Sequence, residues 1–166
     1  MSSDSVEFRR AIDDDIVEVM DLLTSNGLPT DGVRELGDRM IVAWAGGRVV
    51  GAAGLEVHGQ DGLLRSVVVA DDRRGRGLGQ ALVHKVMDLA RLEDLRDVYL
   101  LTEGAGGYFD RLGFERLDRA SITSAVTESA EFSHLCPSTA VAMVSRLRDS
   151  HVVREEEEGN AGAPKR

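Results

Sequence analysis

A Gly-rich turn with three arginines contains the residues of this sequence best suited to chemistry. It reads Arg73-Arg74-Gly75-Arg76-Gly77-Leu78-Gly79 and stands between an apolar run and a helical pattern. Glycine leaves backbone N–H groups accessible because it has no Cβ, and a following helix presents its positive dipole end at the same place. Arginine adds planar hydrogen bonds to phosphate oxygens. The turn therefore predicts an anion site, and a pyrophosphate fits it best.

Spacing separates this turn from two other phosphate motifs. A Walker loop requires Gly-Lys-Ser/Thr, which is absent, and a dinucleotide G-x-G-x-x-G requires glycine where Gln80 stands. The pattern that remains is Arg74-x-x-Gly77-x-Gly79. An ordinary surface turn with solvated arginines is the alternative interpretation.

This pattern resembles the acetyl-CoA motif of the GNAT superfamily of N-acetyltransferases, written Gln/Arg-x-x-Gly-x-Gly/Ala. Two segments add to the resemblance: Ser66-Val67-Val68-Val69 before the turn and Phe109-Asp110-Arg111-Leu112-Gly113-Phe114 after it. The resemblance covers about residues 6–147, and it implies acetyl-CoA as the co-substrate, with no metal. The coenzyme-binding residues that it implies are Val67, Val68, Val69, Arg74, Gly75, Arg76, Gly77, Leu78, Gly79 and Phe109.

The resemblance also implies how the coenzyme is held. In the family, strands four and five splay apart at a bulge, and pantetheine pairs with the backbone of strand four. By resemblance that strand contains Val67 and Val69, and the N–H near Val69 polarises the thioester carbonyl. An edge that a sheet would otherwise have to protect then serves as a ligand slot.

The general base that removes the ammonium proton of the acceptor is harder to place. Some GNAT enzymes carry a Glu on strand four, but leucine, arginine and serine occupy residues 64–66 here. Glu56 on the neighbouring strand is the first substitute, and His58 is the second. A solvated or salt-bridged role is the alternative for both.

The general acid is displaced by one residue. A Tyr in the segment after strand five often protonates the thiolate in this family, but Phe109 occupies its position and Tyr108 stands one residue earlier. On a helix this turns the side chain by about 100°. Tyr108 is the candidate acid; the alternatives are a packing role for Tyr108 and protonation by water.

Three segments narrow the acceptor. Residues 26–30, 100–103 and 132–137 resemble the arsenic-resistance N-acetyltransferases, and the first two are also similar to the acetyltransferase domain of N-acetylglutamate synthases. Both parallels imply an amino-acid-like acceptor, whose carboxylate Arg65, or else Arg10 or Arg119, could bind. The candidate acceptor-site residues are Leu28, Thr30, Arg65, Thr102 and Cys136. Cys136 could instead be a buried packing residue.

Three functions follow from these residues. The leading one is acetylation of a small amino-acid-like amine, in resistance to arsenic or to toxic amino-acid analogues. Acetylation of a protein N-terminus or lysine is the second. The third is a non-catalytic acetyl-CoA-binding module, since the family's Glu and Tyr are missing from their usual positions.

The periodicity of apolar residues predicts the helices and strands that position these residues. A helix over residues 77–92 joins strands over 63–70 and 97–102, so these strands should be parallel neighbours linked by a right-handed crossover. The predicted fold is α/β (α+β): a mixed, mostly antiparallel GNAT sheet with helices on its faces. The other predicted elements are a strand over 6–11, a helix from its N-cap Asp13 to Gly27, a loop or short helix over 30–39, a hairpin of 40–45 with 48–57, a helix over 107–112, a strand over 114–119, a helix or loop over 121–132 and a strand over 140–147.

Length and composition bound what else the chain could be. Its 166 residues suit one domain, expected over 1–148, with a disordered acidic tail over 149–166. A net charge of −9 disfavours nucleic-acid binding, and no apolar run is long enough for a membrane helix. The single cysteine excludes an intrachain disulfide, and His84 and His134 are expected to be structural. We expect a cytoplasmic protein with a small-molecule amine as partner; a homodimer stays open.

Overall fold

The computed structural model describes residues 5–132 and 139–147. The predicted tail over 149–166, together with Cys136 and His134, lies outside the described residues.

Seven strands form one sheet in the order β1-β2-β3-β4-β5-β7-β6. All neighbours are antiparallel except β4 and β5, which are parallel and are joined by a helix as predicted. The α+β fold with a mixed, mostly antiparallel sheet is therefore confirmed. The strands are β1 Glu7–Arg10, β2 Met40–Ala45, β3 Arg48–His58, β4 Asp61–Val69, β5 Asp97–Thr102, β6 Glu115–Leu117 and β7 Val141–Arg146.

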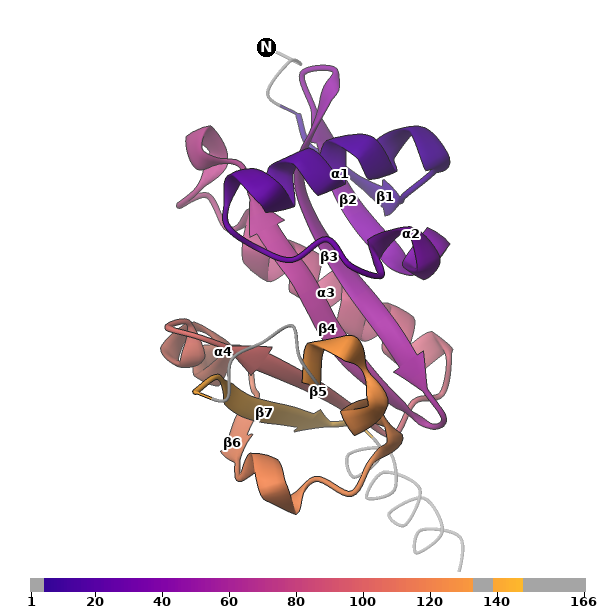
Figure 1. The fold of residues 1–166 in the computed structure, drawn as a ribbon. Helices are drawn as coiled ribbons and strands as arrows, with labels where there is room; N and C mark the ends of the chain where they lie inside the picture. The colour runs from indigo at the N-terminus through magenta and orange to yellow at the C-terminus, as the bar shows by residue number, and fades with distance from the viewer. Residues whose placement is uncertain (1–4, 133–138, 148–166) are drawn as a thin grey trace, which may run out of the picture.

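Helices cover both faces of the sheet. In Figure 1, α1 (Asp13–Ser25) and α2 (Val33–Leu36) lie over one face, and α3 (Leu78–Leu92) lies behind the other. The predicted apolar stripe of α3 is buried, with Leu82, Val86 and Leu89 in the core between this helix and the sheet. A fourth helix, α4 (Gly106–Arg111), follows β5. The segment 121–132, expected as a helix or loop, contains the short 3-10 turn Ala125–Glu128, and another such turn, Arg119–Ser121, precedes it.

The start of α1 differs from the prediction. Ile12, not Asp13, is the N-cap residue. Asp15 provides the cap instead, because its Oδ2 accepts a hydrogen bond from the Ile12 N–H at 2.9 Å. The same carboxylate pairs with Arg9 of β1 at 2.7 Å. The position of the helix is therefore set by a contact to the neighbouring strand, which local spacing does not encode.

β4 and β5 pair over three residues only, from Asp61↔Asp97 to Leu63↔Tyr99. Beyond Leu63 the two strands diverge, as Figure 1 shows. On its other side β4 has one extra residue opposite β3, because Gly54 pairs with Arg65 and Ala52 with Val68. Ser66 lies inside this bulge with φ of 60°, a left-handed conformation that is strained for serine. The predicted bulge and splayed strands are therefore present.

Candidate active site

Two cavities flank the opening between β4 and β5. The first, which we call the turn cavity, has a volume of about 670 Å³ and lies along the Gly-rich turn. Its lining residues are Asn26, Leu28, Val67, Val68, Val69, Arg73, Arg74, Gly75, Gly77, Leu78, Gly79, Gln80, Glu103, Ala105 and Tyr108. Most of the predicted coenzyme-binding residues line it, and the exceptions are Arg76 and Phe109.

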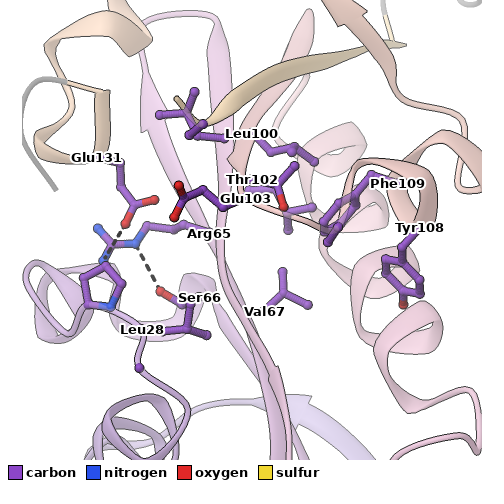
Figure 2. A pocket seen from close by; sticks show the side chains of 16 residues that line it. Leu28, Arg65, Ser66, Val67, Leu100, Thr102, Glu103, Tyr108, Phe109 and Glu131 are labelled. Atoms are coloured by element: carbon purple, nitrogen blue, oxygen red, sulfur yellow. Dashed lines mark hydrogen bonds and ion pairs between the residues drawn. The ribbon is translucent and has the colours of Figure 1, made fainter. Parts of the chain in front are cut away.

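The second cavity, the strand cavity, has a volume of about 460 Å³ and lies between β4, β5 and α4. Figure 2 shows Tyr108 and Phe109 on one side of Val67 and Arg65 on the other. Its lining residues are Gly27, Leu28, Pro29, Leu64, Arg65, Ser66, Val67, Leu100, Leu101, Thr102, Glu103, Ala105, Tyr108, Phe109, Glu131 and Ala140. Three predicted acceptor-site residues, Leu28, Arg65 and Thr102, are among them, and Thr30 is not.

The two cavities share one stretch of wall. Leu28, Val67, Glu103, Ala105 and Tyr108 line both of them. We call these five residues the junction. A ligand that fills the turn cavity and a ligand that fills the strand cavity would meet there.

The Gly-rich turn exposes backbone donors to the turn cavity. Gly75 and Gly77 both adopt φ of 80°, and Gly77 is the N-cap of α3 without any side-chain cap. The first N–H groups of an α-helix have no intrahelical acceptor, so those of α3 remain available to an anion. Arg73 and Arg74 add positive charge to the wall, whereas Arg76 is exposed and does not line the cavity.

Arg74 holds the turn against its surroundings. Its Nε donates to the Val69 carbonyl oxygen at 3.2 Å, and it pairs with Asp71 at 3.0 Å. Its Nη2 also donates to the Asn26 side-chain oxygen, which ties the loop after α1 to the cavity.

The β4 backbone beyond the bulge faces the opening. The Ala70 N–H donates to the Val50 carbonyl on the β3 side at 2.9 Å. Backbone groups alternate in direction along a strand, so the N–H of Val69 is directed away from β3. This is the orientation that the predicted pairing with a ligand requires.

Arg65 lies in the wall of the strand cavity but is heavily engaged. Its side chain is 1% exposed, and its Nη1 donates to Glu56 Oε2 at 2.8 Å. Nε donates to Ser66 Oγ at 3.1 Å, and Nη2 donates to the Asp31 carbonyl. Figure 2 shows the remaining contact, an ion pair between Nη2 and Glu131 at 3.7 Å.

Glu56 does not line either cavity. Its Oε1 lies 2.6 Å from His58 Nε2, and its Oε2 accepts from Arg65. Burial by itself would raise the pKa of Glu56, but hydrogen bonds from Ser129, His58 and Arg65 outweigh it and the pKa is lowered. The charged form of Glu56 is therefore stabilised by side chains that already bind both of its carboxylate oxygens.

Tyr108 lies at the junction, with its hydroxyl against the backbone of the turn. A Cβ built on Gly79 would be 2.7 Å from the Tyr108 hydroxyl oxygen, so a larger residue at position 79 would require Tyr108 to move. Burial raises the pKa of Tyr108 and keeps the phenol protonated at neutral pH. Its ring meets Phe109 edge to face at 5.1 Å, and Phe109 itself is buried in the core beside the strand cavity.

The other candidates lie away from the cavities. Arg10 pairs with Asp38 at 3.3 Å, Arg119 donates to the Phe132 carbonyl at 2.8 Å, and His84 is exposed on α3. The sequence assigned no role to Glu103 or Glu131, although both line the strand cavity. Glu103 ends the segment Leu100-Leu101-Thr102-Glu103. The resemblance of this segment to N-acetylglutamate synthases was the one sequence feature that could have pointed to Glu103 as an acceptor-site residue.

Metal binding and membrane insertion find no support in the described part of the chain. Within residues 5–132 and 139–147, no three His, Cys, Asp or Glu side chains are grouped as metal ligands. Over the same residues, every helix is too short or too polar to cross a bilayer.

Sequence comparisons agree with this geometry. Residues 37–116 match the family model described as an acetyltransferase (GNAT) domain. The amino-acid acetyltransferase of Mycobacterium tuberculosis is 32% identical over 107 residues, which are 64% of this chain and 58% of that protein. The alignment thus spans little more than half of the relative's length.

Solved structures share the fold. A Mycobacterium tuberculosis protein in complex with CoA and NLQ superposes with a TM-score of 0.73 at 25% identity, over 85% of this chain and 99% of that chain. N-acetylglutamate synthase from Neisseria gonorrhoeae, complexed with coenzyme A and N-acetyl-glutamate, also reaches a TM-score of 0.73. Its identity is 18%, over 86% of this chain and 35% of that chain, so this similarity concerns the fold alone. Together with the Gly-rich turn and the splayed strands, these matches show the GNAT fold in this chain and an acetyltransferase (GNAT) domain match over residues 37–116.

Proposed function

We propose that this protein transfers the acetyl group of acetyl-CoA to the amine of a free amino acid such as glutamate. The observation that carries the proposal is the junction, where a cavity with an anion-binding turn meets a second cavity of small-molecule size. The name of the sequence relative, amino-acid acetyltransferase, supports an amino-acid acceptor.

The residues of the turn cavity fit a coenzyme pyrophosphate. The N-terminus of α3, which has no side-chain cap, the left-handed Gly75 and Gly77, and Arg73 and Arg74 all line this cavity and would bind anionic groups there. Bound acetyl-CoA supplies an activated acetyl thioester. The N–H of Val69 would donate to the ligand backbone or to its carbonyl oxygen, where negative charge develops.

Tyr108 is proposed to donate its proton toward the leaving sulfur. The hydroxyl lies at the junction, and its raised pKa keeps the proton in place at neutral pH. Glu56 was the first candidate base in the sequence. Its ion pair with Arg65 and its contact with His58 favour a positioning role, in which Glu56 holds the Arg65 guanidinium in the cavity wall.

The acceptor is proposed to lie in the strand cavity, with its carboxylate at Arg65. The contact of Arg65 with Glu131 is the longest of its side-chain contacts, at 3.7 Å, and Glu131 lines the same cavity. An acceptor carboxylate could therefore exchange with Glu131 at Nη2. The segments that resemble arsenic-resistance enzymes extend the proposed acceptors to arsenic-containing and other toxic amino-acid analogues.

Thiol release tests this proposal directly. The purified protein would be mixed with acetyl-CoA and each of a panel: glutamate, other amino acids, phosphinothricin-like and arsenic-containing analogues, and peptides with free N-termini or lysines. We expect turnover with one or more free amino acids and none with the peptides. Turnover with peptides alone would favour a protein acetyltransferase. Calorimetric binding of acetyl-CoA without turnover on any amine would replace the proposal with a coenzyme-binding module.

A further inference from the structure

We infer that Glu103 is the general base of this enzyme: its carboxylate removes a proton from the acceptor's ammonium group at the junction of the two cavities. This inference rests on the proposed function and names a residue that neither the family resemblance nor the sequence pattern assigned.

Position is the first argument. Glu103 follows directly after β5, at the opening where β5 has separated from β4. Its side chain is exposed and lines both the turn cavity and the strand cavity. Among the residues that the structure describes, it is the only carboxylate at the junction. An acceptor amine in the strand cavity would meet the acetyl group of a coenzyme in the turn cavity at this junction. A base must lie within hydrogen-bond reach of the proton that it removes.

The competing carboxylates are already engaged. Glu56 is held by Arg65 and His58 at 2.8 and 2.6 Å and lies outside the lining of both cavities. Glu131 lines only the strand cavity, where its side chain is 9% exposed and pairs with Arg65. Both carboxylates already pair with the Arg65 guanidinium, so taking a proton from the acceptor would disrupt an existing ion pair.

The surroundings of Glu103 leave room for this role. Thr139 Oγ1 donates to its Oε2 at 3.0 Å, which orients the carboxylate and leaves its other oxygen for the acceptor. The charged or titratable groups that share the strand cavity with it are Arg65, Tyr108 and Glu131. Those that share the turn cavity are Arg73, Arg74 and Tyr108.

The step balances as follows. Glu103 takes one proton from the ammonium group and thereby frees the nitrogen lone pair. The lone pair forms the C–N bond to the thioester carbonyl carbon, the C–S bond breaks, and its electron pair leaves on sulfur. The nitrogen loses a second proton to solvent as the amide forms, sulfur gains one from Tyr108 or water, and that donor regains its proton from solvent. Glu103 returns its proton to solvent, so one ammonium and one thioester give one amide, one thiol and one proton.

The test compares Glu103→Gln and Glu103→Asp with Glu115→Gln, a matched control on the exposed strand β6. For an amino-acid acceptor we expect kcat/KM of Glu103→Gln to fall about 100-fold or more, with partial recovery in Glu103→Asp. For O-methylhydroxylamine, an amine already neutral at pH 7, the loss should be below about 10-fold because no proton has to be removed first. The control should match the wild type with both acceptors.

Two readouts do not depend on turnover. Coenzyme A should bind Glu103→Gln and wild type with the same affinity in calorimetry, which shows that the variant is folded. A 13C NMR titration of glutamate-labelled protein should identify the Glu103 carboxyl by its absence in Glu103→Gln. Its pKa should coincide with an acid-limb pKa of the wild-type kcat/KM profile, and that limb should be lost in the variant.

The outcomes separate the two proposals. An active wild type whose Glu103→Gln variant keeps its kcat/KM and its acid limb overturns the role of Glu103 alone. Equal losses with the amino acid and with O-methylhydroxylamine likewise overturn it, because a positioning defect would affect both. A wild type that binds coenzyme A but acetylates no amine overturns the proposed function and the role of Glu103 with it.

Discussion

At the scale of single residues, Tyr108 shows how a one-residue offset can be absorbed. The helix α4 is short and lies beside the N-terminus of α3, so the Tyr108 hydroxyl meets the backbone of Gly79 although Phe109 holds the motif position. Phe109 turns inward instead and packs between Tyr108 and Phe114. The phenol is thus placed at the junction by packing.

Removing this hydroxyl tests its proposed role. In Tyr108→Phe the ring contact with Phe109 is preserved, while the proton for the leaving sulfur is lost. We expect kcat to fall about 100-fold, with the affinity for coenzyme A unchanged in calorimetry. Burial raises the pKa of Tyr108 above its usual value of about 10. At pH values below about 10, wild-type activity should therefore not decline through deprotonation of Tyr108. A variant with wild-type kcat would leave Tyr108 a packing residue.

At the scale of elements, the anion site depends on how the Gly-rich turn enters α3. The left-handed Gly77 caps this helix, and a Cβ built there meets no atom within 4 Å. A side chain at this position would therefore extend into the space that the phosphates need.

Gly77→Asp should abolish coenzyme binding, because it sets a carboxylate where the pyrophosphate belongs. Gly47→Asp is the matched control: Gly47 has φ of 76°, has equally open surroundings, and lies in the hairpin turn between β2 and β3. Both variants carry the same backbone strain, so their stabilities should fall alike. Calorimetry should detect coenzyme A binding to the control but not to Gly77→Asp. If Gly77→Asp keeps its affinity, the pyrophosphate does not bind at this turn.

A second element is held by one buried carboxylate. Asp61, at the start of β4, is 3% exposed. Its Oδ2 accepts from Ser124 at 2.6 Å and from Arg96 at 3.4 Å. These bonds fasten the 3-10 turn Ala125–Glu128 to the sheet and bring Glu131 to the strand cavity.

Ser124→Ala should lower the free energy of unfolding by about 1–3 kcal/mol, because it removes the shorter hydrogen bond of a buried carboxylate. Ser121→Ala, whose hydroxyl bonds the exposed Asp118 carbonyl at 2.6 Å, should change it by less than about 0.5 kcal/mol. Urea denaturation measures both. Equal effects would mean that Asp61 does not anchor this segment.

At the scale of the whole molecule, the buried polar network around Arg65 couples the β3–β4 hairpin to the segment ending at Glu131. Its charges are compensated only while the carboxylates are ionised. Acid should therefore lower the free energy of unfolding more than it would if these charges formed only an ion pair on the surface.

The pH dependence follows from the lowered pKa of Glu56. A carboxylate whose pKa is lower in the folded state stabilises the protein above its unfolded pKa, about 4.3, and loses that contribution as pH falls through the folded value. Urea midpoints measured from pH 7 down to pH 3 should decline less in Glu56→Gln than in wild type. Glu115→Gln should decline like wild type, and a parallel decline in Glu56→Gln would contradict the network's role.

Local spacing was enough for much of this molecule. The apolar patterns of the β-strands, the Gly46-Gly47 turn and the apolar stripe of α3 can all be recognised from residues a few positions apart. The turn from Arg74 to Gly79 is equally local, since its glycines and the helix that follows form one continuous unit. The N-cap of α1 was wrong because Asp15 is shared with Arg9 of a neighbouring strand.

The sequence by itself determined the fold class, the order of the elements and the Gly-rich turn proposed to bind an anion, because each can be predicted from residues a few positions apart. Only the tertiary structure decided the acceptor side. It paired Arg65 with Glu56 and Glu131, and it brought Glu103 and Tyr108 to the same junction as Val67. Arg65 and Val67 on β4 lie far in sequence from Glu103, Tyr108 and Glu131, and the sheet order with its diverging β4 and β5 sets their distances. Which arginine lines the cavity and which carboxylate is exposed there depends on such long-range pairings, and single-sequence spacing carries no record of them.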